Sequence, residues 1–98
     1  MQQTFIKTTA GPTTSIDAGV GKVFRSLNMK INGGTPTTVV NLEVSPDDTT
    51  YTLVTNAAGD GERWGYAGSN SVGRYTRANV VATGGSSSVT VLIAGYAS

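Results

Sequence analysis

Apolar and polar residues alternate with a period of two along several short stretches of the chain. Such alternation is typical of a β-strand with one face in a core and the other in solvent. The clearest stretch covers residues 22–31, whose predicted inward face carries Val23, Leu27, Met29 and Ile31 together with Arg25. Phe24 falls on the outward face of the same strand. Because no window carries apolar residues at helical spacing, the pattern predicts strands throughout.

Further strand-like segments are separated by clusters of Gly, Pro, Asn, Asp and Ser, which favour turns. The other predicted strands cover residues 38–44, 49–55, 73–82 and 88–96. Hairpin turns are predicted at residues 45–48 and 83–87, and longer loops at residues 56–61 and 68–71. The strand over residues 88–96 is apolar on both faces, which indicates either a central strand or one covered by a partner.

These elements amount to about seven or eight short strands at spacings of roughly 8–12 residues. They predict one all-β domain, an antiparallel β-sandwich or small barrel of jelly-roll or immunoglobulin-like type, formed by residues 16–98. Residues 1–15 are polar and extended, with Phe5 and Ile6 as apolar anchors. Two interpretations of this segment stay open. It is either an ordinary edge strand or an arm that pairs with a neighbouring subunit through backbone hydrogen bonds.

Charge and hydropathy exclude several classes of partner. The chain has 7 Lys and Arg against 6 Asp and Glu, a formal net charge of +1, so it lacks the basic field that binds nucleic acid or anionic lipid. Its apolar runs are far shorter than the ~20 residues that span a bilayer. The first residues lack the apolar core of a secretion signal. Together with the absence of cysteine, this favours synthesis in a reducing cytoplasm.

Reactive side chains are scarce. The chain has neither cysteine nor histidine, which excludes disulfides, thiolate or imidazole metal ligands and a histidine base. Asp60 and Glu62 could serve as glycosidase carboxylates only in a cleft that held them about 5–9 Å apart. With Asn56 they make a poor calcium loop, because hard oxygen ligands are too few. We therefore expect no enzymatic activity, metal or cofactor, and expect self-association to help stabilise so small a domain.

Residues 63–77 gather the only tryptophan, two of the four tyrosines and three of the four arginines. These residue types dominate interface hot spots, because they bury much area and also make directed polar contacts. Two other interpretations stay open. Trp64 could fill the core, or Trp64 and Tyr66 could lie exposed and coplanar as a platform for a sugar ring. The predicted protein interface consists of Phe5, Ile6, Arg63, Trp64, Tyr66, Arg74 and Arg77.

Residues 73–80, the Gly84-Gly85 turn and residues 88–93 resemble the C-terminal hairpin of small β-sandwich virion proteins from tailed bacteriophages, and residues 49–53 fit the same pattern. The Gly73-x-Tyr75 step is similar to the tyrosine corner of immunoglobulin-like domains, although Arg77 stands where those domains carry a cysteine.

The virion resemblance implies a capsid decoration (cement) protein on the capsid surface, or a tail or fibre module. As a decoration protein the chain is expected to form a homo-oligomer, with a trimer favoured, and to bridge subunits of the major capsid protein. The alternative is a carbohydrate-binding or receptor-binding module of a phage tail or fibre, whose partner is a glycan.

Overall fold

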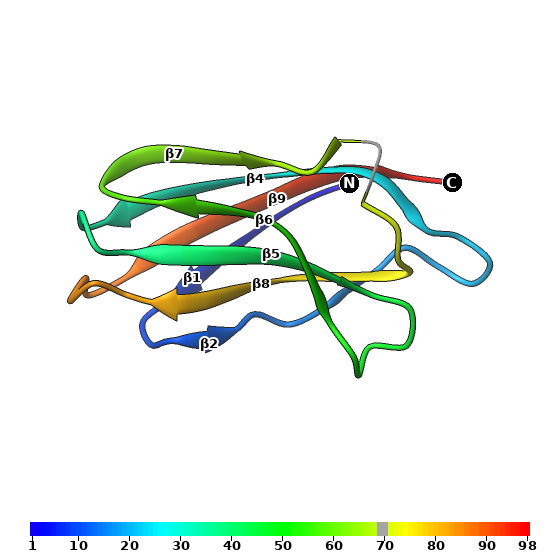
Figure 1. The fold of residues 1–98 in the computed structure, drawn as a ribbon, viewed down its shortest axis with the longest axis horizontal. Coiled ribbons are helices and arrows are strands. Elements are labelled where there is room, and N and C mark those ends of the chain that lie inside the picture. The colour runs from blue at the N-terminus through cyan, green and yellow to red at the C-terminus, as the bar shows by residue number, and fades with distance from the viewer. Residues whose placement is uncertain (69–70) are drawn as a thin grey trace.

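The computed structural model describes residues 1–68 and 71–98, which form two antiparallel β-sheets packed face to face (Figure 1). The predicted loop over residues 68–71 includes residues 69 and 70, which lie outside the described residues. The strand order of the first sheet is β1 (Gln2–Lys7), β9 (Val89–Ala97), β4 (Phe24–Gly34), β7 (Gly61–Tyr66). The order of the second is β2 (Gly11–Pro12), β8 (Tyr75–Ala82), β5 (Val39–Ser45), β6 (Thr52–Ala58), and β3 (Ile16–Asp17) also pairs with β8. The predicted all-β sandwich is confirmed.

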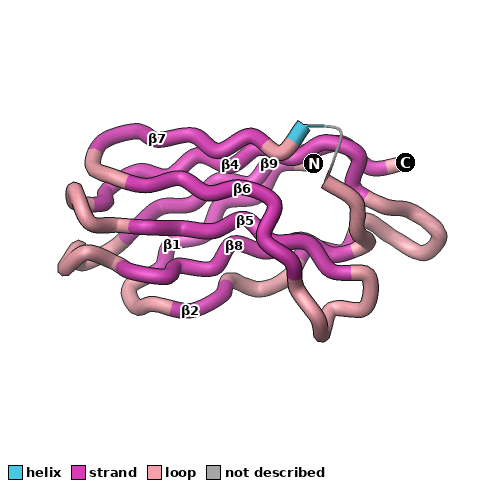
Figure 2. Tube along the Cα trace, in the orientation of Figure 1, coloured by secondary structure: helices cyan, strands magenta, loops and turns pink. Residues whose placement is uncertain are grey.

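The two sheets form the two layers of the molecule (Figure 2). The core lies between them and is built from alternate residues of the longest strands. This is the arrangement that the period of two predicts for β5, β8, β9 and most of β4. The strand predicted to be central, now β9, lies between β1 and β4. The buried side chains of these four strands include Leu27, Met29, Ile31, Val40, Leu42, Val44, Ala78, Val80, Val89, Val91 and Ile93.

Phe24 is buried, and its predicted outward position is wrong. The pairing of β4 with β9 shifts by one residue here: Phe24 faces Ala97, whereas Ser26 faces Tyr96. Arg25 is therefore the extra residue of a β-bulge, which reverses the alternation at this end of the strand. As a result Phe24 and Leu27 both point inward, although an unbroken strand would put them on opposite faces.

The turn after β5 is longer than predicted, and the strand predicted over residues 49–55 is displaced to β6. The Asp47 carboxylate organises this turn. Its Oδ1 accepts hydrogen bonds from the backbone N–H groups of Thr49 and Thr50 and from the Ser45 hydroxyl, at 2.9–3.0 Å. These bonds lower the pKa of Asp47. The loop predicted over residues 56–61 is instead the end of β6, a tight turn and the start of β7.

The N-terminal segment contributes strands to both sheets. β1 pairs with β9 at the edge of the first sheet, and the chain then crosses to the second sheet, where β2 and β3 pair with β8 (Figure 1). Within β1 the two apolar anchors separate. Phe5 packs against the core, whereas Ile6 points outward and is 69% exposed. Neighbouring residues of a strand project from opposite faces, so Phe5 and Ile6 cannot act as one anchor.

Candidate interaction surface

The outer face of the first sheet carries exposed aromatic side chains. Trp64 and Tyr66 project from β7 and are 46% and 68% exposed, and Tyr96 projects from β9. Strand pairing places these residues on the side opposite to the buried residues of β4 and β9. Trp64 is therefore not a core residue. We call this surface the aromatic face, and define it by Ile6, Trp64, Tyr66, Leu92 and Tyr96.

Trp64 and Tyr66 form a pair. Their ring planes are parallel to within 6° and their centroids are 5.9 Å apart, an offset stack. Lys30 stands opposite Trp64 on β4, and its Nζ lies 5.6 Å from the centre of the indole ring. The same Nζ is 3.6 Å from a carboxylate oxygen of Glu62. The tryptophan is thus held by a ring from its own strand and a cation from the next strand.

Gly65 explains why both aromatic side chains stand on the outer side. It lies between them on β7 and points inward, where the backbone of β6 passes close by. A Cβ at Gly65 would lie 2.6 Å from the carbonyl oxygen of Asn56, which is too close for any side chain. The glycine lets β6 and β7 approach each other and fixes the outward direction of Trp64 and Tyr66.

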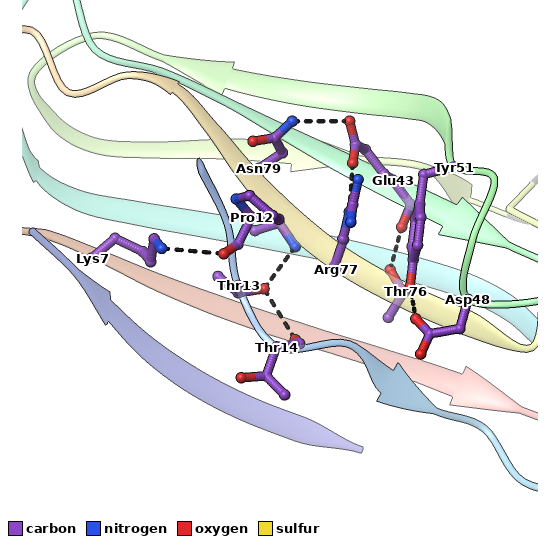
Figure 3. Close-up of polar contacts among 11 residues, drawn as sticks. Lys7, Pro12, Thr13, Thr14, Glu43, Asp48, Tyr51, Thr76, Arg77 and Asn79 are labelled. Carbon is purple, nitrogen blue, oxygen red and sulfur yellow. Dashed lines mark hydrogen bonds and ion pairs between the residues drawn. The ribbon is translucent and has the colours of Figure 1, made fainter. Parts of the chain in front are cut away.

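The outer face of the second sheet carries a network of polar side chains that bind one another (Figure 3), beside the exposed Leu53 and Val81. Arg77 Nε donates to Glu43 Oε1 at 2.9 Å, and Asn79 donates to the other carboxylate oxygen at 3.4 Å. The Arg77 guanidinium also stacks on the ring of Tyr51, 3.8 Å from its centroid. The Glu43 side chain is only 13% exposed. The charges of this network are therefore paired inside the chain.

Tyr51 completes this network from the turn between β5 and β6. Its hydroxyl donates to the carboxylate of Asp48, a residue held in the left-handed region with φ of 63°. Burial, and then the bond to Asp48, raise the pKa of Tyr51 to about 12. The phenol thus stays protonated at neutral pH and binds within the turn, while the ring of Tyr51 contacts Arg77 on β8 (Figure 3).

The other two predicted interface arginines are also paired within the chain. Arg74 makes a two-bond ion pair with Asp17, at 2.7 and 2.8 Å, which ties β3 to the start of β8. Arg63 donates to the backbone carbonyl of Asp60, and the two side chains lie 3.5 Å apart. All three predicted interface arginines are therefore paired within the chain. Arg77 lies on the outer face of the other sheet.

The Asp17–Arg74 pair makes stability depend on acid. The hydrogen bond from Arg74, together with the backbone N–H of Gly19, lowers the pKa of Asp17 from 3.8 to about 2. A carboxylate with a lowered pKa stabilises the fold above its ordinary pKa, and that contribution is lost as the pH falls through about 2. As the pH is lowered through this range, we expect the free energy of unfolding to fall less for an Asp17→Asn variant than for the wild type. Urea unfolding at a series of pH values measures this difference.

An Asp60→Asn variant is the control for this acid prediction, because it removes one negative charge from the longer Asp60–Arg63 pair. Asp47 contributes to the acid response of all three proteins alike. Parallel curves of stability against pH for the wild type and Asp17→Asn would contradict the prediction.

The described residues hold no group of three or more metal-ligating side chains, and no pocket opens among them. Asp60 and Glu62 were considered above as catalytic or calcium-binding carboxylates. Asp60 pairs with Arg63 in the β6–β7 hairpin, and Glu62 pairs with Lys30 on β4. Within the same residues, no helix is long and apolar enough to cross a membrane.

Comparison with known proteins gives one informative likeness. No family model matches the chain, and neither does any curated protein. Among solved structures, the crystal structure of the SPBc2 prophage-derived protein YomS matches with a TM-score of 0.64. The match covers 100% of this chain and 94% of the YomS chain at 16% sequence identity. The chain therefore shares its complete fold with a prophage-derived protein.

Proposed function

We propose that this chain is a structural protein of a bacteriophage particle, a capsid decoration protein that binds the major capsid protein. The shared fold with a prophage-derived protein supports a phage origin. So does the resemblance of residues 73–80 and 88–93 to the hairpin of phage virion proteins. The observation that carries the proposal is the contrast between the two outer faces of the sandwich.

That contrast selects one face for docking. The polar network of the second sheet already satisfies its own charges, whereas Trp64, Tyr66 and Tyr96 expose aromatic area on the first sheet. Exposed tryptophan and tyrosine gain the most when a protein partner covers them. In this proposal each copy docks its aromatic face across neighbouring coat subunits. Contacts that are weak singly become strong when they repeat over the capsid lattice.

The ring geometry favours a protein partner over a glycan. A sugar platform needs an open, flat aromatic surface, but Trp64 and Tyr66 stack on each other rather than forming one plane. Lys30 lies over the indole as well, and its charge is paired with Glu62. Ring edges and the alkyl stem of Lys30 therefore contribute much of the surface, which suits packing against protein side chains.

Cosedimentation with empty capsids of the same phage tests the proposal. The wild type is expected to sediment with capsids, and a Trp64→Ala, Tyr66→Ala double variant to bind at least about tenfold more weakly, because hot-spot rings are lost. A Val81→Ser variant is the matched control. Val81 is 54% exposed on the outer face of the other sheet, so binding should not change.

Other outcomes would overturn the docking proposal. A wild type that ignores capsids, or equal losses for Val81→Ser and the aromatic double variant, would contradict it. Trp64 is the only tryptophan, so its fluorescence reports on this face alone. A fluorescence shift on addition of host surface polysaccharide, without capsid binding, would favour the glycan-binding module instead. Thermal unfolding of each variant checks that the fold is intact.

A further inference from the structure

Among the described residues, β1 leaves one edge of the first sheet without a partner strand. It pairs with β9 on one side and is the terminal strand of its sheet on the other. Six consecutive residues, Gln2 to Lys7, pair with β9 without any register shift. A regular edge of this length offers a row of backbone donors and acceptors to any strand that can lie alongside.

The hydrogen bonds of Met1 show which residues face that open edge. The N–H of Gly95 donates to the carbonyl of Met1, and the Met1 amine donates to the carbonyl of Gly95, both at 3.0 Å. Met1 and Gly95 are thus a hydrogen-bonded pair, and such pairs alternate along an antiparallel ladder. The odd-numbered residues of β1 therefore bond to β9. The N–H and C=O groups of Gln2, Thr4 and Ile6 point away from β9.

This edge lacks the devices that usually block strand addition. Residues 2–6 contain no proline and no charged side chain, and the strand has no bulge. Lys7 is the one lysine of β1. Its ammonium donates a hydrogen bond to the backbone carbonyl of Pro12 in the same chain at 3.1 Å (Figure 3). Ile6, beside the edge, leaves an apolar side chain in solvent.

We propose that the open edge of β1 binds β1 of a second copy in antiparallel orientation, about a twofold axis that passes beside Thr4. Thr4 then faces Thr4 of the second copy, and Gln2 faces Ile6. The contact forms about six backbone hydrogen bonds, two for each of three facing pairs. It joins the two four-stranded sheets into one continuous sheet and extends the aromatic face across both copies.

The edge itself favours a second copy over a foreign strand. An isologous contact needs a surface that is complementary to itself. Gln2, Thr4 and Ile6 meet this condition, because their exposed backbone groups repeat at every second residue around Thr4 and none of the three side chains carries a charge. Pairing two copies also covers the open β1 edge of each copy at once, whereas a foreign strand covers the β1 edge of only one copy.

This contact is distinct from capsid docking, which uses the outer face of the sheet rather than its edge. It also differs from the trimer that the virion resemblance implies, because a twofold contact produces pairs. Failure of capsid binding would leave the pairing intact, and absence of pairing would leave docking by single copies intact.

Proline at position 4 tests the hydrogen-bonded edge. Thr4→Pro removes an N–H that points away from β9, so the intramolecular ladder keeps its bonds. We expect sedimentation equilibrium to show a dimer for the wild type and for Thr4→Val, and dimerisation at least about tenfold weaker for Thr4→Pro. A monomeric or trimeric wild type would overturn the proposal, as would a Thr4→Pro variant that dimerises like Thr4→Val.

Cysteine crosslinking tests the register, and the cysteine-free chain gives no background. Facing Thr4→Cys residues would have Cα atoms about 5.5 Å apart, within disulfide range. Mild oxidation should therefore link Thr4→Cys dimers. Gln2→Cys alone should not link, because its two copies are about 14 Å apart, whereas Gln2→Cys mixed with Ile6→Cys should. Efficient linking of Gln2→Cys to itself, or none of Thr4→Cys, would overturn this register.

Discussion

Replacing Phe24 by alanine is expected to lower the free energy of unfolding by about 3–5 kcal/mol, the usual cost of deleting a buried phenylalanine ring. Phe24 is 1% exposed and belongs to the core cluster. Its removal leaves a cavity beside Leu27 at the end of the sandwich where the bulge brings both side chains inward. Urea unfolding of the variant and the wild type measures the difference.

The Phe24 experiment also distinguishes the bulged β4 of the structure from the unbroken strand that simple alternation predicts. On an unbroken strand Phe24 would be a surface residue, and its replacement would change stability by about 0.5 kcal/mol or less. Arg25→Ala is the control, since Arg25 is the exposed extra residue of the bulge. A loss for Phe24→Ala no larger than that for Arg25→Ala would show that the bulge is absent.

A single methyl group at position 65 is expected to cost about 1–3 kcal/mol, in the range of overpacked cores. The added Cβ of Gly65→Ala would meet the Asn56 carbonyl oxygen at 2.6 Å and the Thr55 side chain at 3.2 Å. Backbone atoms cannot rotate away, so β6 and β7 must separate. Because Gly65 lies between Trp64 and Tyr66, thermal unfolding and tryptophan fluorescence should both change.

Tyr66→Ala is the comparison for Gly65→Ala. It removes a whole ring from the same strand, but that ring is largely exposed, so we expect a loss of about 1 kcal/mol or less. Adding one inward methyl would thus destabilise the fold more than deleting an outward tyrosine ring. The reverse order would mean that β6 does not lie against Gly65.

The inward faces of β5, β8 and β9 could be predicted from sequence because each strand runs without a bulge through its buried section. The same pattern failed at Phe24, since one inserted residue reverses all positions on one side of it. It also failed around Thr49 to Tyr51. Those residues favour strands by type, but the Asp47 side chain binds their backbone in a turn.

The make-up of the aromatic face could be predicted only in part from sequence. Trp64 and Tyr66 share a face because they are two residues apart on one strand, which a period of two predicts. Arg77 lies only eleven positions beyond Tyr66 but belongs to the other sheet, and sequence distance does not show that separation. Lys30 and Tyr96 were missed because their positions beside the aromatic pair depend on strand pairing between distant segments.

The position of β9 has a consequence for how the protein is made. Among the strands of the described residues β9 is translated last, yet it lies between β1 and β4 and pairs with both. Until β9 has been made, β1 has no partner strand and one edge of β4 is unpaired. The first sheet therefore closes late in synthesis, and before then its unpaired strand edges are open to aggregation.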